Sequence, residues 1–155
     1  MPKTPDAVQD FLAQKHIVVA GVSRTSSQPA NAIYRRLRDA GYQVTAVNPA
    51  ATEVEGDPCY PDLASVPGTV DGVMMATAPE ATFAVARECV ELGIPRVWMH
   101  RSFGEGSVSD QAAELCRSRG MSVIVGGCPM MFVEPVDVFH ACMRWVLGIR
   151  GRIEA

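Results

Sequence analysis

Short apolar runs that end at a glycine or a turn alternate along this chain with segments of helical periodicity. The first run covers residues 17–21, and similar runs lie at 42–47, 70–76, 96–99 and 121–125. Helical patterns separate them at 29–40, 79–92 and 107–119. Runs that are apolar throughout are typical of strands buried on both faces of a parallel sheet, and alternating strands and helices build such a sheet. We therefore expect a Rossmann-like, doubly wound, mainly parallel α/β sheet in three layers.

The length of the chain suits one domain. Its 155 residues, 48% hydrophobic and 20% charged, are enough to cover a central sheet with helices. We expect a single domain over residues 1–155. Helical spacing adds an N-terminal helix over 5–14 and a C-terminal helix over 135–147, which we expect to begin at Pro135.

Charge and cysteine spacing exclude several classes of function. A net charge of -3 offers no basic surface for nucleic acid, so we expect no such partner. No apolar run approaches the roughly 18 residues that span a bilayer, so we expect no membrane segment. The five cysteines are scattered and lack a C-x-x-C spacing, which indicates neither a disulfide framework nor a metal site. These features favour a cytoplasmic protein.

The loop after the first strand is a candidate phosphate site. It runs Gly21-Val22-Ser23-Arg24 and leads into the first long helix, where free backbone N–H groups and the helix dipole attract an anion. Neither G-x-G-x-x-G nor the P-loop pattern is present. A tight turn that uses a glycine is the alternative interpretation.

The end of the second strand reads Val47-Asn48-Pro49. Proteins that bind NAD usually place an acidic residue there to hold the ribose hydroxyl. Asn48 is neutral and does not repel a phosphate on the ribose, so the position disfavours NAD(P) and allows a phosphorylated ribose. The alternative is that Asn48 and Pro49 only turn the chain.

A set of short motifs now carries a resemblance. They are Gly21-Val22-Ser23, Asn31, Gly41-Tyr42 with Val44, Val47-Asn48-Pro49, Tyr60 with Asp62-Leu63-Ala64 and Pro67, Val70-Asp71, Gly93, Val97-Trp98-Met99 and Cys128-Pro129. Together they resemble the small stand-alone CoA-binding domain proteins, which are similar to the nucleotide-binding domain of the succinyl-CoA synthetase α subunit. The resemblance covers roughly residues 10–131.

The resemblance implies a ligand and a set of contacts. The Gly21–Arg24 loop, with Val22 and Ser23, would hold the diphosphate of coenzyme A. Asn48 and Pro49 would border the adenosine, and Ala78 and Pro79 would line the opposite wall. Relatives often carry a lysine after V-N-P and an arginine before the Pro-Glu pair, where this chain has Ala50 and Thr77-Ala78. Arg24 or Arg35 would then have to hold the ribose phosphate.

Two further residues follow strands on the ligand side. His100 ends the strand at 96–99, and either contacts the ligand or serves as a general base, although no nucleophile or Asp partner is identifiable. Cys128 follows the last strand, and either exchanges with the sulfur of coenzyme A or packs as a small hydrophobic residue. We expect no catalytic residue.

The C-terminal helix carries more apolar surface than one contact needs. One stripe holds Val136, Phe139, Met143, Val146 and Leu147, and Trp145 lies off it. A homodimer through this helix is one interpretation. The other is that Trp145 covers the N-terminal helix around Phe11 and Leu12 within one chain.

The sequence therefore favours a cytoplasmic module that binds coenzyme A or an acyl-CoA, with no evident catalysis. The alternative is an enzyme, either an NAD(P)-dependent oxidoreductase or a CoA-utilising enzyme with His100 in its active site. No Tyr-x-x-x-Lys pair follows Tyr34.

Overall fold

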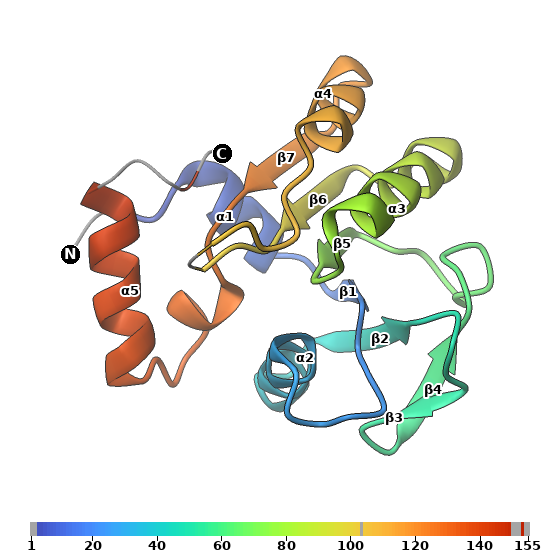
Figure 1. The fold of residues 1–155 in the computed structure, drawn as a ribbon, viewed down its shortest axis with the longest axis horizontal. Coiled ribbons are helices and arrows are strands. Elements are labelled where there is room, and N and C mark those ends of the chain that lie inside the picture. The colour runs from blue at the N-terminus through green and yellow to red at the C-terminus, as the bar shows by residue number, and fades with distance from the viewer. Residues whose placement is uncertain (1–2, 103, 150–152, 154–155) are drawn as a thin grey trace.

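A seven-stranded sheet forms the centre of the computed structural model, which describes residues 3–102, 104–149 and 153. The strand order is β3-β4-β2-β1-β5-β6-β7. The strands are β1 (His16–Ala20), β2 (Gln43–Val47), β3 (Glu53–Val54), β4 (Asp57–Tyr60), β5 (Gly72–Met75), β6 (Arg96–Met99) and β7 (Ser122–Val125). All neighbouring pairs are parallel except β3 and β4, which form an antiparallel hairpin. The expected doubly wound α/β fold is confirmed (Figure 1).

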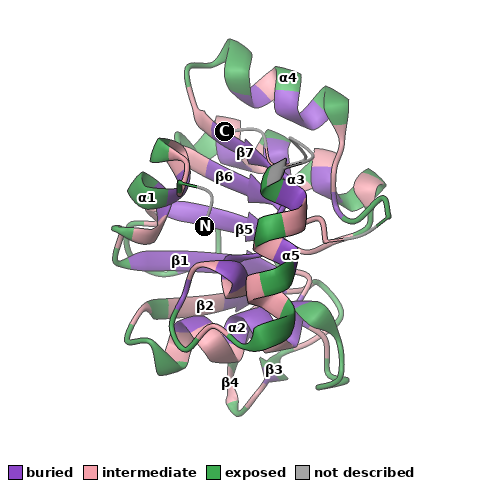
Figure 2. Cartoon of the chain, turned by 90° about the vertical axis from the view of Figure 1, so that its left-hand side faces the viewer, coloured by how far each residue is buried: buried purple, intermediate pink, exposed green. Residues whose placement is uncertain are grey.

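Helices cover both faces of the sheet and complete the three layers. One face packs α1 (Asp6–Leu12), α2 (Pro29–Asp39), the short 3-10 helix η1 (Pro129–Met131) and α5 (Val138–Ile149). The other packs α3 (Pro79–Leu92) and α4 (Asp110–Ser118). Alternate residues of β1 supply the two cores, Ile17 to the first and Val18 to the second. This double coverage explains why the strand is apolar throughout (Figure 2).

The chain reverses its direction across the sheet between β1 and β5. It leaves β1 for β2 on one side and later returns to β5 on the other, so the carboxyl ends of these two strands flank the switch point. Gly21 follows β1 there with a φ of +99°, and a Cβ on it would lie 2.4 Å from the Ala76 carbonyl oxygen. Only glycine fits this close approach of two backbones.

The terminal helices differ from expectation in their bounds. Helix α1 lies within the expected range of 5–14. Helix α5 begins at Val138 instead of Pro135, because Asp137 accepts the His140 backbone N–H at 3.0 Å and caps the first turn. None of the helices among the described residues has the length and apolarity to cross a membrane.

The buried stripe of α5 also differs from expectation. Met143 and Leu147 are buried, but Phe139 is 61% exposed and Trp145 is 55% exposed. The inward face is shared with Arg144, which lies over the Phe132 ring and donates to the Thr4 hydroxyl at 2.6 Å. Arg144, rather than Trp145, therefore joins α5 to the N-terminal segment.

Candidate functional site

Two cavities meet at the switch point. The first, called here the Asn48 cavity, measures about 430 Å³ and is lined by Ala20, Gly21, Val47, Asn48, Pro49, Pro61, Ala76, Thr77, Ala78, Ala81, Ala84, Val85 and Glu88. The second, the His100 cavity, measures about 360 Å³ and is lined by Gly21, Gln28, Pro29, Ala30, Ala76, His100, Ser102, Gly106 and Ser107. They share Gly21 and Ala76. A larger cavity of about 780 Å³, lined in part by Lys15, Gly41 and Gln43, lies where β1 and β2 begin, away from the switch point.

The loop after β1 is held by a buried asparagine that follows it in α2. Asn31 is 1% exposed, and its Oδ1 accepts the Ser23 backbone N–H at 2.9 Å while its Nδ2 donates to the Ser23 carbonyl at 2.6 Å. The Thr25 N–H donates to the Ser23 hydroxyl, and the Gly21 N–H donates to the Val47 carbonyl. Three N–H groups of the expected phosphate loop are thus bonded within the chain.

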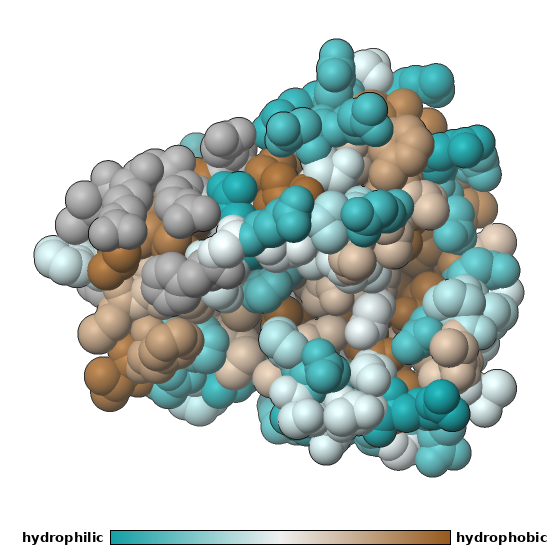
Figure 3. All heavy atoms as spheres, viewed as in Figure 1, coloured by the Kyte–Doolittle hydropathy of each residue, from teal (hydrophilic) through white to brown (hydrophobic). Residues whose placement is uncertain are grey.

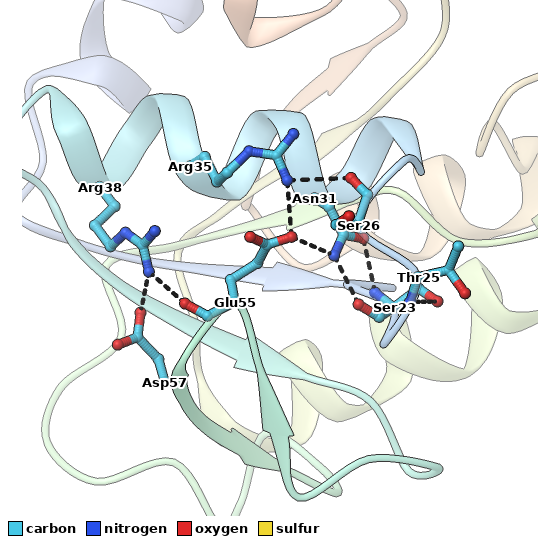
Figure 4. Close-up of polar contacts among 8 residues, drawn as sticks. All are labelled: Ser23, Thr25, Ser26, Asn31, Arg35, Arg38, Glu55 and Asp57. Atoms are coloured by element: carbon cyan, nitrogen blue, oxygen red, sulfur yellow. Dashed lines mark hydrogen bonds and ion pairs between the residues drawn. The ribbon is translucent and has the colours of Figure 1, made fainter.

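The β3–β4 hairpin supports the same loop through Glu55 (Figure 4). The Glu55 carboxylate accepts from Asn31 Nδ2 and from Arg35, each at 2.8 Å. Arg35 also donates to the Ser26 carbonyl. Glu55 has a φ of +51°, and with Gly56 at +79° it forms the tight turn of the hairpin. Arg35 is therefore committed to the hairpin and the loop.

Sequence reasoning missed the role of this hairpin. The Cys59-Tyr60 segment reads as a short strand, but nothing local shows that Glu55 reaches α2. A Glu-Gly pair between two short strands is a hairpin signal that could have located the turn. The partner of Glu55 follows only from tertiary packing, since Asn31 lies 24 residues earlier.

Asn48 ties the end of β2 to the loop after β1. Its Nδ2 donates to the Val22 carbonyl and its Oδ1 accepts the Ala50 N–H, both at 2.8 Å. Ala78 lines the facing wall of the Asn48 cavity, and Pro79 is the first residue of α3. Turn formation and a place in the cavity, which were alternatives for Asn48, therefore hold together.

Arg24 lies exposed beside this cavity. With Pro49 and Pro61 it lines a hollow of about 380 Å³, and the two prolines also line the Asn48 cavity. The only other arginine expected to serve a ribose phosphate, Arg35, is engaged by Glu55. Arg24 is therefore the better placed of the two for an anion next to Asn48.

His100 is buried in its cavity as a neutral imidazole. Its Nε2 lies 3.2 Å from the Ser102 hydroxyl. Burial, with a smaller effect from His140, lowers the pKa of His100 to about 4. At neutral pH the ring therefore carries no charge and has one N–H donor and one acceptor nitrogen.

Two of the expected site residues have their side chains in the core. Val22 is fully buried and Cys128 is 3% exposed, both in the cluster that includes α2 and α5. Burial raises the pKa of the Cys128 thiol to about 11, so the thiol stays protonated at neutral pH. This geometry favours packing over thiol exchange for Cys128, and leaves Val22 to act through its backbone.

The comparison with known families is decisive for the lineage of the chain. The family model described as the CoA binding domain matches residues 15–134. This chain belongs to the CoA-binding domain family. Members of the CoA-binding domain family share the expected resemblance over nearly the same residues, so that expectation is confirmed.

Three similar proteins place the chain within the CoA-binding domain family. The uncharacterized protein YneT of Bacillus subtilis (strain 168) is 28% identical over 143 residues, which cover 92% of this chain and 98% of the relative. The ADP-forming acetate–CoA ligase I of Archaeoglobus fulgidus is 32% identical over 145 residues, 90% of this chain but 21% of the ligase. A solved hypothetical protein from Pyrococcus horikoshii OT3 superposes with a TM-score of 0.74 at 25% identity, covering 84% and 94% of the two chains.

Proposed function

We propose that this chain, as a single domain, binds coenzyme A or an acyl-CoA at the switch point of its sheet. The observation that carries the proposal is the pair of cavities that meet at Gly21 in a member of the CoA-binding domain family. Ligands of open parallel sheets bind at this place. The chain acts as a binding module, and the residues in the crevice supply recognition.

The adenosine lies in the Asn48 cavity, between Pro49 and Ala78. Its ribose phosphate is held by Arg24, which borders the neighbouring hollow. The diphosphate crosses Gly21 and Ser23 toward the N-terminus of α2, where the helix dipole favours negative charge. In this arrangement Asn31 and Glu55 position the loop without touching the ligand.

Coenzyme A is preferred to NAD(P) because no carboxylate ends β2. Asn48 stands there, and its amide is already bonded to Val22 and Ala50. The ribose hydroxyls of NAD would lack the acidic partner that dinucleotide-binding proteins usually provide.

We also propose that the chain forms a homodimer through α5 and works in the cytoplasm. The outward side of α5 presents Val138, Phe139, Cys142 and Trp145, and Figure 3 shows apolar side chains gathered at the left, over this helix. Identical subunits most often pair about a two-fold axis. The five free cysteines are consistent with a reducing compartment.

A thermal unfolding series with coenzyme A and NAD tests the proposed ligand. At a free ligand concentration of 100 times Kd, coenzyme A should stabilise the protein by about 2.7 kcal/mol. NAD at the same concentration should give a much smaller shift. An equal shift with NAD, or no shift with coenzyme A, would contradict the proposal.

A further inference from the structure

The His100 cavity is built by fixed backbone rather than by a loose loop. The Ser107 N–H donates to the His100 carbonyl at 2.7 Å, and the buried Thr82 hydroxyl donates to the Ser107 carbonyl at 2.7 Å. The Arg101 N–H donates to the Gly127 carbonyl at 3.0 Å. A Cβ on Gly106 would lie 2.5 Å from the His100 carbonyl oxygen, so the segment closes tightly on itself. The walls of the cavity are therefore set before any ligand arrives.

The lining of the cavity has two different sides. Pro29, Ala30 and Ala76 present small apolar surface from α2 and from the end of β5. His100 and Ser102 bring the polar side chains that face each other at 3.2 Å. A small apolar space with a few fixed polar groups is typical of a site that orients a neutral ligand group.

The position of the cavity relates it to the proposed ligand. It shares Gly21 and Ala76 with the Asn48 cavity, so the two open on either side of the same ridge. If adenosine fills one cavity and the diphosphate crosses Gly21, the far end of the ligand reaches the other. This step rests on the proposed binding of coenzyme A.

The polar pair selects the chemistry of that far end. A neutral imidazole donates a hydrogen bond to a carbonyl oxygen without demanding a negative charge, and a serine hydroxyl does the same. A carboxylate or phosphate would instead require a cation, and the polar side chains that line this cavity are His100, Ser102, Ser107 and Gln28. The volume of about 360 Å³ lies at the small end of the range for ligand sites, about 300–1,000 Å³, which suits a short acyl group.

We propose that the His100 cavity receives the acyl end of a short-chain coenzyme A thioester, with His100 and Ser102 hydrogen-bonded to the thioester carbonyl. The chain therefore distinguishes an acylated from a free coenzyme A. His100 and Ser102 act here as specificity residues, and no bond is made or broken.

Calorimetric titration with acetyl-CoA and with S-ethyl-CoA tests this subsite. The two probes have the same carbon chain, but S-ethyl-CoA lacks the carbonyl oxygen. The wild-type protein should bind acetyl-CoA about 3- to 10-fold more tightly, the effect of one or two net hydrogen bonds. Ser102→Ala and His100→Asn should reduce that preference while keeping the affinity for S-ethyl-CoA. Ser118→Ala, an exposed serine at the end of α4, is the matched control and should keep the preference.

The outcomes separate this inference from the proposed function. Equal affinity of the wild-type protein for the two probes would overturn the thioester subsite and leave coenzyme A binding intact. A preference that survives in a folded Ser102→Ala and a folded His100→Asn protein would also overturn it. Failure of both probes and of coenzyme A to bind would overturn the proposed function, and the subsite with it.

Discussion

The side-chain amide of Asn48 donates a hydrogen bond to the backbone carbonyl of Val22 at 2.8 Å. One bond thus joins the loops that follow the two central strands β2 and β1, on either side of the Asn48 cavity. The distance between these loops determines the width of the proposed adenosine site. Asn48 therefore shapes the site even where it makes no contact with the ligand.

Asn48→Ala tests this link. The change leaves the Val22 carbonyl and the Ala50 N–H without their partner, so the free energy of unfolding should fall by about 1–3 kcal/mol. Affinity for coenzyme A should fall as well. Urea denaturation and calorimetry measure the two effects. Gln43→Ala, at the exposed start of the same strand, is the control and should change neither by a comparable amount.

Asn31→Asp should be more damaging than a change of size alone. It places a second carboxylate against the Glu55 carboxylate, 2.8 Å from the present amide nitrogen, at a position that is 1% exposed. We expect a loss of about 3 kcal/mol in the free energy of unfolding. Adding Glu55→Gln should recover part of it, because the new amide can donate to Asp. A double variant no more stable than Asn31→Asp would argue against direct contact between these side chains.

Arg24→Ala should reduce the discrimination between coenzyme A and its 3′-dephospho form. An exposed arginine on a phosphate contributes up to about 1 kcal/mol, so the affinity ratio should shrink about 5-fold. Calorimetry with both ligands measures the ratio. Arg35→Ala is the comparison, because Arg35 is paired with Glu55 and should alter stability more than the ratio. If Arg35→Ala abolished the discrimination and Arg24→Ala did not, the roles would be reversed.

The buried His100 should make stability depend on pH in a defined window. Its pKa is lowered to about 4 in the folded chain and is about 6.5 when unfolded, so the unfolded state binds the proton first. Stability should therefore be complete above about pH 6.5 and fall by roughly 3 kcal/mol as the pH drops toward 4.

His100→Gln should flatten this part of the profile, which chemical denaturation at several pH values records. The carboxyls of Asp57 and Asp137 have a pKa below their usual range, because hydrogen bonds from Arg38 and Tyr34 to the first, and from His140 to the second, favour the charged form. Their effect therefore belongs below about pH 4. An unchanged slope between pH 6.5 and 4.5 in the variant would show that His100 is not responsible.

Trp145→Glu tests the proposed dimer. Sedimentation at micromolar concentration should show a dimer for the wild-type protein and a folded monomer for the variant, because the charge would be buried at the interface. Leu92→Glu is the matched control, since Leu92 is 47% exposed at the end of α3, away from α5, and should leave the dimer intact. A wild-type monomer would contradict the proposal.

The layered fold was predictable because its signals are local. Apolar runs such as 17–21 reflect burial on both faces of a strand, and Pro29, Pro79 and Gly41 mark where helices begin and end. The rule that ligands bind where strand order reverses then led to Gly21 and Asn48 without knowledge of any contact. The helix at the C-terminus was right in kind but wrong by three residues at its start, because the cap at Asp137 competes with the proline signal.

Only the tertiary structure decided which polar groups meet. The bonds from Asn31 to Ser23 and to Glu55, and the commitment of Arg35 to the hairpin, depend on how β3 and β4 fold back beside α2. The same holds for the inward side of α5, where Arg144 takes the place that helical periodicity suggested for an apolar residue. Periodicity records whether a position is buried, since burial follows the repeat of the backbone. It carries no record of which distant side chain supplies a hydrogen bond, because that partner is set by the packing of whole elements.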